Sequence, residues 1–119
     1  YGVAFGPDHS QTINAGESIT YTHWLTNTGN MADSFGLALS SSRGWASALD
    51  PGPVMLGAGA SASVRVRVDA PAGSGGLADV AVITATSQAS PTVWARVTDT
   101  TTARVTGYKI YLPVVLKNS

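Results

Sequence analysis

Alternation of apolar and polar residues is the feature that most constrains what this chain can fold into. In the clearest example, Val64, Val66 and Val68 alternate with the charged residues Arg65 and Arg67. Successive side chains of an extended strand point to opposite faces, so a period of two indicates a strand with one buried face and one face in water. No window keeps the three- and four-residue apolar spacing of a helix. We therefore expect strands and almost no helix.

The same alternation recurs along the chain, between clusters of turn-forming residues. Besides 64–68, strands are predicted at residues 3–13 with an interruption at Pro7, and at 17–28, 34–40, 45–49, 77–87, 93–105 and 108–116. Short strands with turn clusters every 8–12 residues or so are typical of two packed sheets. The sequence predicts an antiparallel immunoglobulin-like β-sandwich of about seven to eight strands, with a barrel as the alternative. Pro7 fits only an edge strand or a change of sheet.

The inward faces of these strands define the predicted core. It consists of Tyr21, Leu25, Phe35, Leu37, Trp45, Leu56, Val64, Val66 and Val68. A chain of 119 residues corresponds to one domain. We expect residues 1–107 to form the sandwich and residues 108–119 to form an apolar C-terminal tail that adds a strand to the same domain. Ile110 and Leu112 would then complete the core, the alternative being that they pair with a neighbouring chain or domain.

Charge and composition exclude several classes of partner. Lys and Arg together number 7, as do Asp and Glu, and charged residues make up only 12% of the chain. No basic field is present to bind nucleic acid or an anionic membrane surface. The apolar runs are too short for a membrane span. A Ser- and Thr-rich surface with little Lys or Glu is common on exported β-modules, so we expect a secreted or cell-surface location.

The two histidines are the only candidate imidazole bases or ligands. Asp8, His9 and Ser10 contain the residue types of a hydrolytic triad, but neighbours on an extended segment point to opposite faces and are poorly placed to relay a proton. His23 lies on an inward face with Tyr21, and we expect a half-buried, hydrogen-bonded side chain rather than a metal ligand. The sequence thus predicts no catalytic residues, and we expect no enzyme activity.

Aspartates near the predicted strand ends are the main candidates for a metal site, which would bind calcium. They are Asp33, Asp50, Asp69, Asp79 and Asp99. A calcium loop has two or more carboxylates close together in sequence, and none of these is so spaced. We therefore interpret them as residues that cap turns and keep the edges of the sandwich soluble. We predict no metal and no cofactor.

Exposed aromatic side chains are what a sugar-binding module would use, because a flat ring stacks on the apolar face of a pyranose. Trp24 and Trp94 are both predicted on the outward faces of their strands. If they lie on the same sheet they could form a platform for a polysaccharide. Alternatively, one covers an edge of the core and the other contacts a neighbouring domain.

Several short motifs also carry a resemblance to a known family. They are residues 15–22, 25–30 and 33–35, the pair Gly44 and Trp45, and residues 56–61, 64–66, 70–73 and 84–88. In this order, over residues 2–105, they resemble the α-galactosidase-associated and conserved-repeat immunoglobulin-like modules of bacterial and archaeal exported proteins, which have a fibronectin III-like fold. The resemblance implies a core position for Trp45. Residues 108–117 are similar to the short endings of large exported bacterial proteins.

This resemblance implies a function without catalysis. We expect an accessory or spacer module at the C-terminus of an exported multidomain protein, such as a peptidase or a glycosidase, with the other domains of that polypeptide as its partners. One alternative is a carbohydrate-binding module that uses Trp24 and Trp94. Another is a surface or oligomerisation module in which the apolar tail pairs with another chain.

Overall fold

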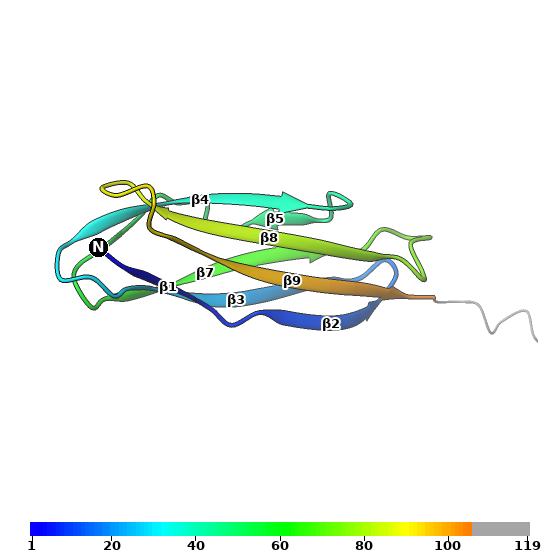
Figure 1. Ribbon diagram of the computed structural model, residues 1–119. Coiled ribbons are helices and arrows are strands. Elements are labelled where there is room, and N and C mark those ends of the chain that lie inside the picture. Colours follow the sequence, from blue (N-terminus) through cyan, green and yellow to red (C-terminus); the bar gives the residue numbers. More distant parts are fainter. Residues whose placement is uncertain (106–119) are drawn as a thin grey trace, which may run out of the picture.

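Two packed β-sheets make up the computed structural model, which describes residues 1–105 (Figure 1). The nine strands within that range are β1 (Val3–Gly6), β2 (His9–Asn14), β3 (Ser18–Asn27), β4 (Asp33–Ser41), β5 (Ala46–Ala48), β6 (Val54–Leu56), β7 (Ser61–Asp69), β8 (Ala78–Ser87) and β9 (Trp94–Arg104). Residues 1–105 form no helix. The predicted all-β immunoglobulin-like sandwich is confirmed.

One sheet has four strands and the other has five. Their orders are β1-β3-β7-β5 and β2-β9-β8-β4-β6. Antiparallel pairing prevails, as between β3 and β7, where Tyr21 lies opposite Val66. One pair departs from the predicted antiparallel arrangement, because β2 runs parallel to β9.

That parallel pair results from the way the first strand changes sheets. β1 pairs with β3 in the four-stranded sheet, and after Pro7 the chain continues as β2 at the edge of the five-stranded sheet. β2 lies beside β9, which runs the same way along the sandwich (Figure 1). The expected change of sheet at Pro7 is therefore present. The structure has more strands than predicted, partly because the single strand predicted at residues 3–13 is two strands, β1 and β2.

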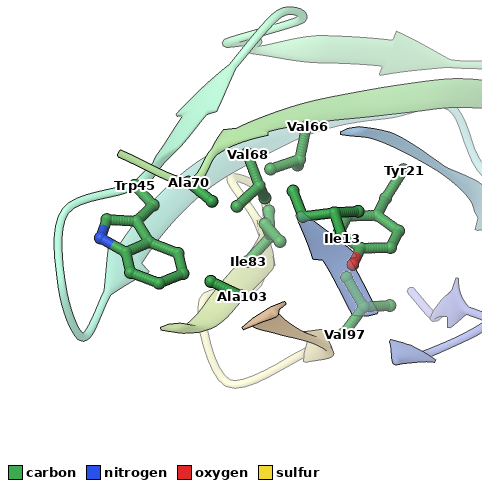
Figure 2. Packing of buried hydrophobic residues seen from close by; sticks show 9 residues of the cluster. All are labelled: Ile13, Tyr21, Trp45, Val66, Val68, Ala70, Ile83, Val97 and Ala103. Carbon is green, nitrogen blue, oxygen red and sulfur yellow. The ribbon is translucent and has the colours of Figure 1, made fainter. Parts of the chain in front are cut away.

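The core lies between the sheets, where the inward faces meet. Eight of the nine predicted core residues are buried, all except Leu37. Figure 2 shows one part of this core, in which Val66 and Val68 of β7 pack against Ile83 and Val97 of the opposite sheet. Trp45 closes this cluster on one side and Tyr21 on the other (Figure 2). The alternating pattern thus identified the buried faces correctly.

Leu37 and β6 also differ from the sequence interpretation. Leu37 is only partly buried. β6 pairs with β4 only at Asp33–Phe35, so β4 has no paired strand on that side from Gly36 onward. The sequence did not predict β6, because its three residues follow the turn-forming run 50–53 and are too few to show alternation.

The predicted C-terminal strand, with Ile110 and Leu112, lies outside the described residues. Its contribution to the core therefore stays a prediction. Residues 1–105 contain no helix that is long and apolar enough to cross a membrane.

Candidate functional site

The two exposed tryptophans lie on different sheets. Trp24 is on β3 of the four-stranded sheet and Trp94 is on β9 of the five-stranded sheet. Both point outward as predicted, with 56% of Trp24 and 50% of Trp94 exposed. Because these two outer faces are on opposite sides of the sandwich, the indoles cannot form one shared platform. The condition on which the platform depended is not met.

The neighbours of each indole differ. Trp24 stands across from Gly6 on one side and Ser63 on the other, and neither residue is large enough to cover the ring. The guanidinium of Arg96 lies 4.7 Å from the centre of the Trp94 ring, a cation–π contact that covers part of that indole. Trp24 is therefore the more accessible of the two surfaces for stacking.

Inside the sandwich, His23 forms the most unusual polar contact among residues 1–105. The alternation of β3 turns its side chain inward, and both His23 and its partner Asp99 on β9 are fully buried. The Nε2 atom of His23 lies 2.7 Å from a carboxylate oxygen of Asp99. Its Nδ1 atom lies 2.7 Å from the backbone carbonyl oxygen of Pro7. The ring thus joins β3, β9 and the segment between β1 and β2.

Both contacts require His23 to donate. The Pro7 carbonyl oxygen and the ionised carboxylate of Asp99 are both acceptors, so with Asp99 ionised each ring nitrogen carries a proton and the ring is an imidazolium. Burial by itself lowers the pKa of His23. The hydrogen bond to Asp99, the negative charge of Asp99, the Pro7 carbonyl and the charge of Asp8 outweigh burial and raise the pKa above 6.5. The geometry and the direction of the pKa shift both show that the folded structure favours the charged form of the ring.

Aromatic rings surround this pair. The edge of Phe5 meets His23, with ring centres 5.8 Å apart, and the His9 ring lies 5.0 Å from His23 and stacks on Tyr21. The Tyr21 hydroxyl is hydrogen-bonded to Thr101 at 2.8 Å. Burial raises the pKa of Tyr21 above 10.0, so the phenol stays neutral near pH 7.

The contacts of His23 with Asp99 and Pro7 indicate a structural role. Both His23 nitrogens are occupied, and the fully buried ring has no surface that a substrate could reach. The expectation of an inward, hydrogen-bonded histidine is confirmed, but His23 is fully buried rather than half-buried. Sequence reasoning missed Asp99 as the partner, although the alternation of β9 places Val97, Asp99 and Thr101 on one inward face.

Asp8, His9 and Ser10 do not act on one another. An oxygen of Asp8 accepts a hydrogen bond from the Thr98 amide at 2.9 Å. The Nε2 atom of His9 lies 3.0 Å from the Thr22 carbonyl oxygen and donates to it. These two side chains bind different strands, as the alternation predicted.

The five aspartates have separate roles. Asp50 pairs with Arg65, and Asp69 binds Ser18 and Arg67. Asp79 is fully buried and accepts hydrogen bonds from the Ser41 hydroxyl and the Arg43 amide. The expectation that Asp79 and Asp99 keep the edges of the sandwich soluble is wrong, because both lie inside it, but Asp79 does cap the turn after β4 by accepting from the Arg43 amide. No group of three or more metal-binding side chains occurs within residues 1–105.

Asp33 borders a shallow hollow at the ends of β4 and β6, beside the exposed Met55. One of its oxygens accepts from the Ser87 hydroxyl and the other from the amides of Ser34 and Ala89. The Ser87 hydrogen bond is the main cause that lowers the pKa of Asp33 below 3.8. Asp33 therefore orders the loop after β8, in agreement with the predicted capping role.

Comparison of the sequence with protein-family profiles found no match, and no curated protein matches either. Similarity was found at the level of structure. The secreted serine protease VesC from Vibrio cholerae contains a region that superposes with a TM-score of 0.63 at 18% identity, covering 86% of this chain and 23% of that one. The VesB protease of Vibrio cholerae gives a TM-score of 0.56 at 18% identity, covering 85% of this chain and 32% of that one.

A third similar structure is a single domain. The ASH or PapD-like domain of human CEP192 superposes with a TM-score of 0.62 at 15% identity, covering 85% of this chain and 84% of that one. At these identities the likeness shows the fold alone. This chain corresponds to about a quarter to a third of the two proteases, and to nearly the whole of the PapD-like domain.

Proposed function

We propose that this chain is a non-catalytic accessory module of an exported multidomain protein, and that it works as a spacer beside a catalytic domain such as a peptidase or a glycosidase. The family resemblance carried by its short sequence motifs, in their order along the chain, favours this class. The fold that it shares with a minor part of two Vibrio cholerae proteases, of which VesC is secreted, is compatible with it.

The observation that carries the spacer function is the path of the chain through the sandwich. Residue 1 and the end of β9 lie at opposite ends of the two sheets (Figure 1). Val3 pairs with Asn27 at one end, whereas Arg104 pairs with Asn14 at the other. Segments joined to β1 and to β9 are thus held apart by the length of the sandwich. A fold with this path separates its neighbours by a defined distance.

The proposal predicts that the gene encodes a longer protein, and the spacer function is tested in that protein. We expect a secretion signal and a catalytic domain upstream of Tyr1. Deletion of this module should impair secretion or activity of that protein. Replacement by an unrelated sandwich of equal length, with its ends also at opposite poles, should restore them.

The replacement also separates spacing from specific docking. Restoration by an unrelated sandwich supports the spacer, because such a module shares the length but not the surface. If secretion or activity is lost on deletion and is not restored by the replacement, the surface of this module itself binds a partner.

A carbohydrate-binding module is the second candidate, favoured by the exposure of Trp24 between two small residues. Affinity gels containing soluble polysaccharides test it. On the spacer hypothesis, the wild-type module migrates as it does in gels without polysaccharide. If the wild type is retarded, and Trp24→Ala abolishes the retardation while Trp94→Ala does not, the module binds polysaccharide on the β3 face.

A further inference from the structure

The segment that crosses from β1 to β2 is held at three points. The Pro7 carbonyl binds His23 at 2.7 Å, an Asp8 oxygen accepts from the Thr98 amide at 2.9 Å, and His9 donates to the Thr22 carbonyl at 3.0 Å. Pro7 and Asp8 lie outside any strand. The crossing therefore depends on side chains more than on strand pairing.

Of these three contacts, only that of His23 reaches both sheets from within the core. The ring belongs to β3, its Nε2 proton goes to Asp99 on β9, and its Nδ1 proton goes to the crossing. Each hydrogen bond uses one of the two protons of the imidazolium. A neutral ring has one proton and cannot make both.

We propose that His23 is a protonation-dependent latch, which in its charged form fastens the crossing between β1 and β2 to both sheets and which releases that crossing when the ring loses one proton. Loss of that proton loosens β1 while the remainder of the sandwich stays folded. This latch is independent of the function proposed above.

The geometry also determines which contact is released. Asp99 is a charged acceptor, so a hydrogen bond to it is stronger than one to the neutral Pro7 carbonyl. The neutral ring therefore keeps the Nε2 proton and loses the Nδ1 proton. The Nδ1 lone pair then faces the Pro7 carbonyl oxygen at a distance of 2.7 Å, where two acceptors repel each other. The crossing moves away from the ring.

The groups facing His23 come from every element around it. Asp8 in the crossing, Asp99 on β9, His9 on β2 and Tyr21 on β3 are titratable, whereas Phe5 on β1 and Val64 on β7 are apolar. The raised pKa of His23 means that the latch is closed below about pH 6.5 and opens as the pH rises past the pKa of the folded state. Tyr21 keeps its proton throughout this range, because its pKa lies above 10.0.

Nitrogen-15 NMR of the two histidine rings tests the first half of the proposal. The chain has 2 histidines, and His9→Gln leaves one ring signal, which assigns His23. We expect His23 to titrate above pH 6.5 and its Nδ1 atom to be the nitrogen that loses the proton. Titration below 6.5, or loss of the proton from Nε2, would overturn the latch.

Amide hydrogen exchange tests the second half, with exposure times scaled for the faster base-catalysed exchange at higher pH. We expect the protection of β1 and the crossing, relative to that of β7, to fall by up to about tenfold for each pH unit between about pH 6.5 and the folded-state pKa of His23, and to level off above that pKa. His9→Gln is the matched control and should keep this dependence. His23→Gln should show low β1 protection that no longer changes between about pH 6 and about pH 9.

Each of these results bears on the proposal. A constant ratio of β1 to β7 protection in the wild type contradicts it, as does loss of the pH dependence in His9→Gln. If His23→Gln does not fold, the titration and exchange measurements on the wild type still show whether the latch exists.

Discussion

His23 and Asp99 are the residues whose burial most needs an explanation. Placing two charges in a core is unfavourable, because both lose their hydration. The charges lie 2.7 Å apart, and the second ring nitrogen is satisfied by the Pro7 carbonyl. A pair of this kind is costly to break from one side, since the remaining charge has no partner.

Removal of Asp99 is therefore expected to be severe. At about pH 6, Asp99→Ala should lower the free energy of unfolding by about 3–5 kcal/mol in urea titrations. Asp50→Ala is the matched control, because Asp50 also pairs with a cation, Arg65, but at the surface, where the side chains are 31% and 51% exposed. A change in Asp99→Ala as small as that in Asp50→Ala would mean that the buried pair does not support the fold.

Two tryptophans allow a similar comparison of packing. Trp45 is only 8% exposed and closes one side of the core cluster, so Trp45→Ala should cost about 3–5 kcal/mol of stability. Trp24 is 56% exposed, and Trp24→Ala should change stability by about 0.5 kcal/mol or less. Thermal and urea unfolding measure both. Equal costs would contradict the assignment of Trp45 to the core.

Among the elements, three edge strands are short. β1 has 4 residues, and β5 and β6 have 3 each. These three strands offer few unpaired backbone groups to another chain, which reduces edge-to-edge aggregation, whereas β2, with 6 residues, and β4 from Gly36 onward have longer unpaired edges. The longest strand, β9, lies inside its sheet between β2 and β8. Its end is fixed by the turn that follows β7.

Gly75, in the turn that follows β7, shows how closely that turn approaches the end of β9. A Cβ atom on Gly75 would lie 2.6 Å from the backbone Cα of Val105, too close for any side chain. We expect Gly75→Ala to lower stability by about 1–3 kcal/mol. Gly57→Ala is the control, since nothing lies within 4 Å of its Cβ position and its backbone has an ordinary φ. Equal melting temperatures for the two variants would contradict this close approach.

At the scale of the whole molecule, the charges divide into surface pairs and a buried pair. The Arg65 hydrogen bond lowers the pKa of Asp50, and the Ser18 hydroxyl, followed by Arg67, lowers that of Asp69. Stability from a lowered carboxyl pKa is complete above about pH 3.8 and is lost as the pH falls through the folded-state value. The raised pKa of His23 acts in the opposite direction.

Stability should therefore pass through a maximum between about pH 4 and about pH 6.5. Added salt screens exposed charges, so about 1 M NaCl should reduce the loss of stability on the acid side of the maximum (the acid limb). The loss of stability on the alkaline side (the alkaline limb) depends on the buried His23 and should be nearly unchanged. Melting temperature against pH at low and high salt measures this. An alkaline limb as salt-sensitive as the acid limb would place its cause at the surface instead.

The sequence by itself determined where most strands lie and which side chains point inward. It did so because the alternation of side chains is a local property of an extended backbone. This is why the inward position of His23 and the outward positions of Trp24 and Trp94 could be predicted.

Only the tertiary structure decided which of these residues meet. Asp99 lies 76 residues from His23 in the sequence, and the two come together because β3 and β9 face each other from different sheets. The same strand order separates Trp24 from Trp94 and places β2 parallel to β9. Strand order depends on the free energy of packing the whole sandwich, which no local pattern contains.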